Sequence, residues 1–334
     1  MNKKLKNIAT YIIFLGIGLF LFYRVYKGVD PKEMWAEMQK ANLWYIGASF
    51  VMGYLAIVSR GIRWKLLLQP MGYNPNIWNS IHSVAFAYFS NTFVPRSGEL
   101  ARCGALNQTD DIPVDKLFGT VITERVIDFI MLFIFMAIAL FGSSAAFLNL
   151  MDEASLDASK MKWIWIGGIM AVVGFSALIM LRKRLMSSAL GQKIRPFLLG
   201  IREGLISVFK MKRKWAFIGH TVFIWLMYYG MSYVVFQGIP GLEDTPPMLI
   251  LIVMIAGGLG MIFPSPGGIG SYHGATEFAF DILGLGLEIG KVYAAIVWFT
   301  QAAMIIITGG IGLAWITIVK VKKRNLSAHG KKPD

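Results

Sequence analysis

The sequence predicts an all-α polytopic membrane protein with about six full transmembrane helices and two oppositely oriented re-entrant helical hairpins. Of its 334 residues, 56% are hydrophobic and 16% are charged, and the mean hydropathy is +0.57. Soluble domains carry about 25% charged residues. Several apolar stretches reach the roughly 18 residues that a membrane-spanning helix needs. Two other apolar stretches are interrupted by proline and glycine, and these interruptions indicate the re-entrant hairpins.

Six stretches are predicted to cross the membrane completely. The first follows Lys3, Lys4 and Lys6, as the apolar part of a signal peptide would. No small-residue cleavage site follows it, so we expect an uncleaved first span. The six predicted spans are 8–22, 43–59, 120–148, 163–181, 215–236 and 290–319.

The segments 77–107 and 248–284 are predicted to enter the membrane, turn and return to their own side. Lipid cannot hydrogen-bond a freed backbone group, so broken helices survive at membrane depth only where protein or water satisfies them. Paired broken segments in the two halves of a transporter indicate its binding site. The residues predicted to make the turns are Pro95 and Gly98 in the first segment and Pro264, Pro266, Gly267, Gly268 and Gly270 in the second.

The distribution of basic residues favours re-entrance over full crossing. If both segments return to their own side, cytoplasmic stretches hold 26 of the 33 Lys and Arg, and external loops hold 7. This asymmetry agrees with the positive-inside rule and places both termini in the cytoplasm. The hairpins then enter from opposite sides, so their tips could meet near the middle of the membrane. This is the geometry of inverted repeats, although the halves share no sequence identity beyond the breaks.

We treat residues 1–334 as one transmembrane domain. Its predicted parts are a first half (1–181), a cytoplasmic segment (182–214), a second half (215–319) and a basic cytoplasmic tail (320–334). Segment 182–214 has apolar residues at helical spacing among its charges, which indicates either an amphipathic helix on anionic headgroups or a connecting helix packed on the bundle. The net charge of +14 would suit nucleic acid, but the basic clusters lie at span ends, so we expect lipid contacts and no nucleic acid.

The first break carries the strongest candidate site. Arg96, Glu99 and Arg102 lie within seven residues of each other, and charge inside a membrane is costly and usually functional. Arginine presents a planar donor fork suited to phosphate, and the helix that begins at Gly98 would add free N–H groups. These residues are therefore predicted to hold a lipid headgroup. The alternative is that Glu99 and Arg102, three residues apart on one helical face, only neutralise each other.

Two charged stretches flank this break in the sequence. Glu124, Arg125 and Asp128 lie at the start of the longest predicted span. Three roles are open for them: contact with the arginines of the first break, proton relay, or ion pairs only among themselves. Arg60 and Arg63, with Trp64, end the second span. An orientation anchor is the first interpretation of these arginines, and a contact with a phosphate headgroup is the alternative. The predicted headgroup-binding residues are Arg63, Arg96, Glu99, Arg102 and Arg125. The predicted supporting or proton-linked residues are Asn91, Glu124, Asp128, His273, Glu277 and Gln301.

The second break differs in chemistry from the first. It has no charge before His273, so its expected contribution is backbone N–H groups and a tight turn. His273 and Glu277, four residues apart, suggest a proton-linked pair because histidine titrates near neutrality. A metal site would need more ligands than these two, and the lone Cys103 excludes an intrachain disulfide and a cysteine metal cluster. We expect no metal and no cofactor.

Together, these residues resemble the lysylphosphatidylglycerol synthase transmembrane family, the flippase-like proteins related to the membrane half of multiple peptide resistance factor. The resemblance covers nearly the whole chain. In that family an acidic residue is usual at the position of His273, and an arginine is common near Gln301. The residues that carry the resemblance are Arg60, Arg63, Trp64, the stretch 91–95, Gly98, Glu99, Arg102, Glu124, Arg125, Asp128, Pro264, Pro266, Gly267, Gly268 and Gly270.

The resemblance implies a lipid translocator, a flippase or scramblase, in a bacterial cytoplasmic membrane. Its expected partners are an anionic phospholipid or a polyprenyl-phosphate lipid, and a homodimer is one of the assemblies left open. The sequence ends without the soluble aminoacyl-transferase domain of two-domain relatives, so we expect no lysyl transfer. The alternatives are a secondary transporter of a small anion, an intramembrane lipid-modifying enzyme and a subunit without transport of its own. The sequence has no G-x-x-x-x-G-K loop for ATP.

Overall fold

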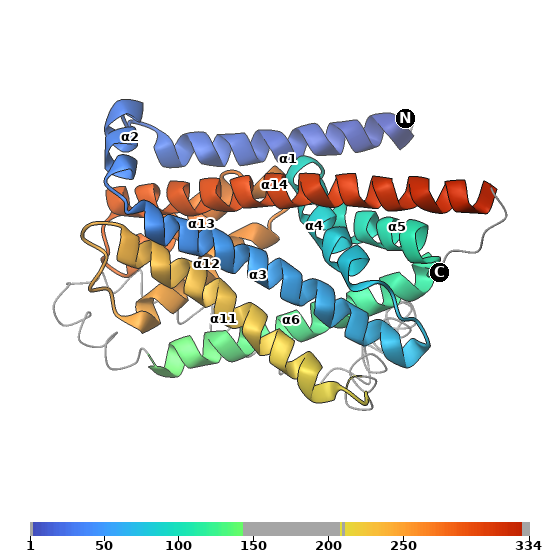
Figure 1. Cartoon of the computed structure of the whole chain (residues 1–334). Coiled ribbons are helices and arrows are strands. Elements are labelled where there is room, and N and C mark those ends of the chain that lie inside the picture. The colour runs from blue at the N-terminus through green and yellow to red at the C-terminus, as the bar shows by residue number, and fades with distance from the viewer. Residues whose placement is uncertain (1–2, 143–207, 209–210, 329–334) are drawn as a thin grey trace, which may run out of the picture.

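The computed structural model describes residues 3–142, 208 and 211–328, and every regular element in this part of the chain is helical. The helices form one elongated bundle in which long helices run along its length (Figure 1). The helices are α1 (Lys3–Tyr26), α2 (Pro31–Gln39), α3 (Leu43–Leu68), η1 (Gln69–Met71), α4 (Ile77–Phe93), α5 (Gly98–Asp110), α6 (Val114–Gly142), α11 (Lys214–Gly238), α12 (Pro247–Ile262), η2 (Pro266–Gly268), α13 (Ser271–Ile282) and α14 (Leu287–Ala328).

Four helices among the described residues are long and apolar enough to cross a membrane: Leu43–Met71, Val114–Gly142, Lys214–Gly238 and Leu287–Leu326. They correspond to four of the six predicted spans. Helix α1 contributes the shorter apolar stretch Leu15–Tyr26. The predicted span 163–181 and nearly all of the predicted amphipathic segment 182–214 lie outside the described residues.

Helix α6 has a largely exposed apolar surface. Its most apolar window has a mean hydropathy of 2.2, yet only 6% of that window is buried. Phe129, Phe133 and Leu140 all project outward. An apolar surface that no described helix covers is unfavourable in water and suits a lipid environment.

Helix α3 does not end where the sequence indicated. A span ending at Ser59 was expected, with the following arginines as an anchor in the interface. The expected anchor is wrong, because α3 continues to Leu68 and carries Arg60, Arg63 and Trp64 into the buried interior. The arginines can be buried because the Asp128 carboxylate of α6 pairs with both of them inside the bundle.

Asparagine side chains set the first turns of α3 and α4. Asn42 accepts the amide of Trp44 at 3.0 Å, and Asn76 accepts the amide of Trp78 at 2.8 Å. Each bond satisfies an N–H group that the first helical turn leaves without a partner. Both helices therefore begin at a defined residue.

The first broken segment forms a closed helical hairpin. At its base, the amide of Asn76 donates to Asp110 Oδ1 at 2.8 Å, so the start of α4 lies beside the end of α5. At its tip, the hydroxyls of Ser90 and Ser97 lie 2.7 Å apart across the break. The predicted helix–break–helix unit is present, and it starts and returns at one end of the bundle.

The second broken segment has the same construction. Phe280 near the end of α13 belongs to one apolar cluster with Leu249 near the start of α12, and the Ser265 and Ser271 hydroxyls lie 2.7 Å apart across the break. Gly267, Gly268 and Gly270 all have positive φ, as a turn this tight requires. That both hairpins dip into the membrane without crossing it stays a prediction.

The tips of the two hairpins meet. Arg96 Nη2 donates to the carbonyl oxygen of Ile262 at 3.5 Å, which joins the first break to the end of α12. A Cβ on Gly267 would lie 3.6 Å from Thr92 Cγ2, so the second break is close to the end of α4. The two Pro/Gly breaks, far apart in the sequence, are therefore one contiguous region of the folded molecule.

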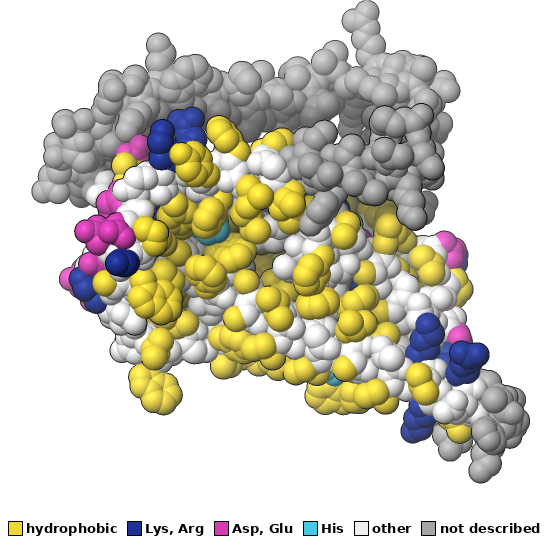
Figure 2. Space-filling view, turned by 90° about the horizontal axis from the view of Figure 1, so that it is seen from above, with side chains coloured by type: hydrophobic (Ala, Val, Ile, Leu, Met, Phe, Trp, Pro, Cys, Tyr) yellow, Lys and Arg dark blue, Asp and Glu magenta, His cyan; other side chains and the backbone are white. Residues whose placement is uncertain are grey.

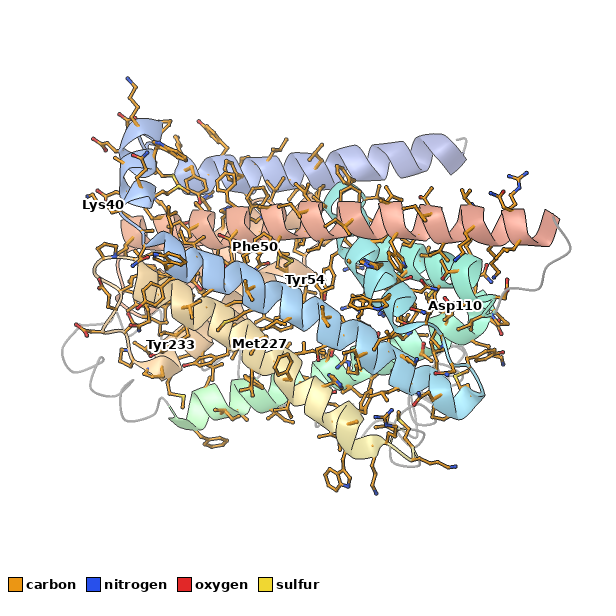
Figure 3. All side chains as sticks on the ribbon, in the orientation of Figure 1. Lys40, Phe50, Tyr54, Asp110, Met227 and Tyr233 are labelled. Carbon is orange, nitrogen blue, oxygen red and sulfur yellow. The ribbon has the colours of Figure 1, made fainter. Side chains whose placement is uncertain are left out.

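Charged side chains gather at the two ends of the bundle, with a hydrophobic surface along its length (Figure 2). Helix α1 begins and α14 ends at the same end (Figure 1). The described chain at that end carries mainly basic residues, among them Lys65, Lys116, Lys212, Arg213, Lys214, Lys320, Lys322, Lys323 and Arg324. Lys40 and Asp110 mark opposite ends (Figure 3).

Of the apolar clusters among the described residues, the two largest join most of the helices. One joins α11, α12, α13 and α14 and includes Phe236, Phe280 and Tyr293. The other joins α3, α4, α5, α6 and α14 and includes Trp64 and Leu106, both fully buried. The second cluster packs beneath the charged groups described next.

Candidate functional site

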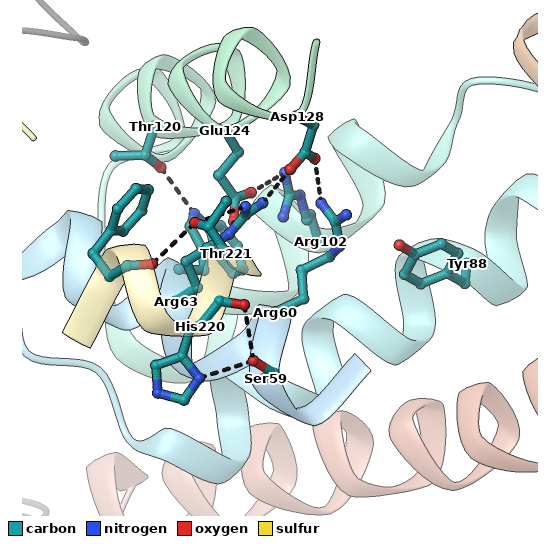
Figure 4. Close-up of polar contacts among 12 residues, drawn as sticks. Ser59, Arg60, Arg63, Tyr88, Arg102, Thr120, Glu124, Asp128, His220 and Thr221 are labelled. Atoms are coloured by element: carbon teal, nitrogen blue, oxygen red, sulfur yellow. Dashed lines mark hydrogen bonds and ion pairs between the residues drawn. The ribbon is translucent and has the colours of Figure 1, made fainter. Parts of the chain in front are cut away.

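Helices α3, α5 and α6 bring five charged side chains together inside the bundle (Figure 4). Asp128 Oδ2 lies 2.7 Å from Arg60 Nη1, and Asp128 Oδ1 lies 2.9 Å from Arg63 Nη2. Glu124 Oε2 lies 2.6 Å from Arg102 Nη2, and Glu124 Oε1 lies 3.6 Å from Arg63 Nε. Arg60 and Arg63 are three residues apart on α3, and Glu124 and Asp128 are four apart on α6. Each pair therefore lies on one face of its helix, toward the other pair.

These groups are removed from solvent. The side chains of Arg63 and Glu124 are 0% exposed, and those of Arg102 and Arg60 are 4% and 7% exposed. Burying an ion costs several kcal/mol, and that cost is offset only when charges pair with good geometry. The network is therefore an expensive feature that the fold stabilises through close ionic contacts.

Aromatic and hydroxyl groups hold the arginines in place. The Arg102 guanidinium lies 4.8 Å from the centre of the Trp64 ring, a favourable cation–π contact. Trp64 Nε1 donates to the hydroxyl of Thr120 at 2.8 Å, which fixes the ring. Arg63 Nη1 donates to Thr221 Oγ1 at 3.3 Å, so α11 also supports the network.

A pair of tyrosines links the network to the first hairpin. Arg60 Nη2 donates to the hydroxyl of Tyr228 on α11 at 3.1 Å. The hydroxyl of Tyr88 on α4 lies 3.3 Å from the same oxygen. Tyr88 is two turns before the break, so the buried charges and the hairpin are connected through hydrogen bonds.

A fourth arginine pairs at the rim of the network. Arg125 Nη2 lies 2.5 Å from Glu99 Oε1, and the two side chains are 57% and 24% exposed. We use "charge network" for Arg60, Arg63, Glu99, Arg102, Glu124, Arg125 and Asp128. Its buried part is centred on α6, and its rim lies at the start of α5.

Arg96 stands outside the network at the tip of the hairpin. It is exposed and adopts a left-handed backbone conformation with a φ of 61°, which is uncommon for a residue with a side chain. Within the described chain it makes no ion pair. Asn91 Oδ1 accepts the Gly98 amide at 2.7 Å and caps α5 directly behind it.

The structure brings most of the predicted first-break residues together, with different partners. The alternative in which Glu99 and Arg102 pair with each other is wrong: Glu99 pairs with Arg125, and Arg102 pairs with Glu124. Arg60, expected to be an orientation anchor, is a member of the network. Sequence reasoning also missed the tyrosine pair, for which an isolated Tyr in an apolar helix gives no signal.

The residues predicted around the second break lie apart from this network. His273 on α13 is 1% exposed, and neither ring nitrogen has a hydrogen-bond partner. No hydrogen bond or ion pair joins it to Glu277 among the described residues, and Gln301 is half-buried on α14. The rings around His273 belong to Phe22, Tyr26, Tyr272 and Trp298, with centroids 5.2 to 5.9 Å away.

The described chain contains an apolar groove but no cluster of metal ligands. No three His, Cys, Asp or Glu side chains in this part come together as a metal site would require. The groove has a volume of about 290 Å³ and lies between α3, α4 and α14. Phe50 and Tyr54 line it where α3 passes α14 (Figure 3). The other lining residues are Ile81, His82, Ala85, Thr308 and Ile311.

These features define an integral membrane protein that holds a charge network beside broken helices. The chain belongs to the family of the lysylphosphatidylglycerol synthase TM region, whose model matches residues 9–309. The family expected from the first-break and second-break residues is confirmed.

Two archaeal membrane proteins are similar to the chain. A UPF0104 membrane protein of Methanocaldococcus jannaschii is 24% identical over 168 residues, which are 49% of this chain and 48% of that protein. The chain thus matches about half the length of this relative. A UPF0104 membrane protein of Pyrococcus horikoshii is 23% identical over 311 residues, covering 85% of this chain and 88% of that protein. No solved structure gives a significant match.

Proposed function

We propose that this protein is a lipid translocase, a flippase or scramblase that moves an anionic phospholipid or a polyprenyl-phosphate lipid between leaflets. One observation carries the proposal. The charge network contains four arginines and three carboxylates, so one positive charge inside the membrane protein has no counterpart within the network. An unbalanced cation in a low-dielectric setting strongly favours an anionic ligand.

Phosphate is the anion that suits these donors. Guanidinium groups bind phosphate through two parallel N–H bonds, and they tolerate burial better than an ammonium does. Arg96 and Arg125 are exposed at the mouth of this region, where they attract a headgroup. Arg60, Arg63 and Arg102 lie deeper in the bundle, where they would shield the headgroup from the hydrocarbon.

The arrangement of helices supports access from both sides. The contacts α3–α4, α5–α6 and α4–α14 in one half have counterparts α11–α12, α13–α14 and α12–α6 in the other, and α3 packs against α11 between them. We read this as an inverted repeat with hairpins entering from opposite membrane faces. Inverted repeats place binding sites near the middle of the membrane and allow alternating exposure.

The lipid chains need only an apolar path. Exposed apolar helix surfaces and the groove beside Phe50 and Tyr54 supply one. Phe50 and Tyr54 precede Arg60 on α3, so a lipid chain in the groove would extend from a headgroup at the network along α3 toward the start of that helix. Only the headgroup would require protein contacts during translocation.

Reconstitution into liposomes tests the proposal. Fluorescent phosphatidylglycerol, reduced by dithionite only in the outer leaflet, reports its own translocation. We expect the wild-type protein to move it faster than protein-free liposomes do. Arg96→Gln should slow it about tenfold, because a nearby unit charge is lost. Lys116 is an exposed lysine on α6, so Lys116→Gln is the matched control and should not slow translocation.

Two results would contradict the proposal: wild-type rates equal to those of empty liposomes, or Arg96→Gln and Lys116→Gln variants that both match the wild type. Uptake of a soluble organic phosphate without any headgroup movement would favour the small-anion transporter instead.

A further inference from the structure

We infer that the charge network selects lipid headgroups that carry one net negative charge. The inference rests on the proposed function and deepens it, because the proposed function names several anionic headgroups and the inference says which of them the protein prefers. Zwitterionic headgroups and headgroups ending in a phosphomonoester are the ones excluded.

The charge balance of the network carries this inference. Asp128 contacts two arginines, Glu124 contacts two, and Glu99 contacts one. Among the described residues, the remaining hydrogen-bond partners of these guanidinium groups are the neutral hydroxyls of Tyr228 and Thr221. The network as a whole therefore has a charge of plus one.

Arg96 does not change this balance. Its guanidinium lies outside the network and points to the carbonyl oxygen of Ile262, the last residue of α12. The C-terminal end of a helix carries roughly half a negative charge. The charge of Arg96 is thus partly matched by α12, and its place is at the mouth of the site.

A single negative charge is the one that restores neutrality. A zwitterionic headgroup leaves the network with its uncompensated cation, and a dianionic headgroup replaces that cation with an uncompensated anion. Unpaired charge removed from water is unfavourable in either case. A phosphodiester with an uncharged alcohol meets the requirement, whereas a phosphomonoester, with a charge of about −1.5 to −2 at pH 7, exceeds it.

The rim pair allows the charge of the network to be changed without disturbing its core. Glu99→Gln raises the surplus to two positive charges, and Arg125→Gln lowers it to zero. Both side chains are partly exposed, and pairs of this kind contribute little to stability. The double variant has neither charge, so its surplus is one again, as in the wild type.

The experiment compares three fluorescent lipids in proteoliposomes: phosphatidylcholine, phosphatidylglycerol and phosphatidate. The wild type should move phosphatidylglycerol fastest. Glu99→Gln should shift the rate ratio toward phosphatidate, and Arg125→Gln should shift it toward phosphatidylcholine. Each shift should be roughly tenfold or more, as for a unit charge about 8 Å away at an effective dielectric constant of about 20. The double variant should regain the wild-type order.

Asp115→Asn and Lys116→Gln provide matched controls, because they make the same charge changes on the exposed first turn of α6 and should leave the order unchanged. Thermal unfolding of each variant shows that it is folded. Equal rates for all three lipids in the wild type, or an order that neither rim variant alters, would overturn the inference while the translocase remains. If the wild type moves no lipid, the proposed function fails and the inference falls with it.

Discussion

Glu124 is the residue on which the charge network depends most. It is fully buried, and its two oxygens face Arg102 and Arg63 from different helices. If this carboxylate is removed, both guanidinium groups stay buried and lose an anion. The neighbouring rim carboxylate, Glu99, contacts a single exposed arginine.

We therefore predict very different costs for two identical substitutions. Glu124→Gln should lower the free energy of unfolding by about 3–5 kcal/mol, the cost of breaking a buried ion pair. Glu99→Gln should lower it by about 0–1 kcal/mol. Unfolding in lipid bicelles measures both. Equal effects would show that Glu124 is not the central anion of the network.

The sequence indicated which charged residues belong to this region, but it did not indicate which of them form ion pairs with each other. Arg102, Glu124 and Asp128 stood out because charge within apolar sequence is rare. Their partners could not be read, since Glu99 and Arg102 have the correct spacing for a local pair and tertiary contacts override it. Arg60 was misread because an arginine that ends a span and one that enters the core look alike until the opposing helix is placed.

At the scale of the element, glycines determine how closely the broken helices approach. A Cβ on Gly98 would lie 2.3 Å from the carbonyl oxygen of Ala87, and one on Gly270 would lie 2.0 Å from the carbonyl oxygen of Gly18. Both distances are far inside van der Waals contact. The first break therefore presses α5 against α4, and the second presses α13 against α1.

For the first hairpin, Gly98→Ala should force α5 away from α4 and move Glu99 from its pairing position. We expect a loss of about 1–3 kcal/mol in stability, as for other overpacked sites, and reduced lipid translocation. Gly104→Ala, on the same helix with open space at its Cβ position, should be neutral or stabilising. A thermal shift that is the same for both variants would argue against the close approach.

For the second hairpin, Gly270→Ala combines the clash against α1 with a φ of +76°, so strain adds to overpacking. Its loss of stability should exceed that of Gly98→Ala. The control is Gly274→Ala, one turn later, where the nearest atom would be 3.8 Å away. Detergent unfolding curves of the two variants provide the comparison, and coincident curves would contradict the packing of α1 on this break.

The elements were partly predictable from the sequence. Proline and glycine marked both breaks correctly, because few other residues interrupt an apolar helix. The nine-residue helix α2, capped by Asp30, was not expected, because it lies in a polar stretch without apolar periodicity. A meeting of the two tips was expected from the opposite directions of the hairpins, but the sequence did not indicate that it joins Arg96 to Ile262, 166 positions away.

At the scale of the whole molecule, the charges at the two ends predict its orientation. Lys116 lies at the basic end with the start of α1 and the end of α14, and Asp244 lies in the turn between α11 and α12 at the other end. The positive-inside rule places the basic end in the cytoplasm. The two similar proteins are archaeal, so the bacterial membrane expected from the sequence stays a prediction.

Cysteine labelling tests this orientation. A membrane-impermeant maleimide added to intact cells should modify the Asp244→Cys variant and should reach the Lys116→Cys variant only after permeabilisation. The native Cys103 is fully buried, so it should give little background. Labelling of both positions from outside would contradict both the orientation and the return of the first hairpin to its own side.

The account as a whole depends on a lipid phosphate meeting the charge network. The most direct test is a density map of the protein in nanodiscs that contain phosphatidylglycerol. We predict a phosphate within hydrogen-bond distance of Arg60 or Arg125, between the hairpin tips and α6. A network closed on itself, with lipid phosphates only at the outer ends of the bundle, would contradict the account.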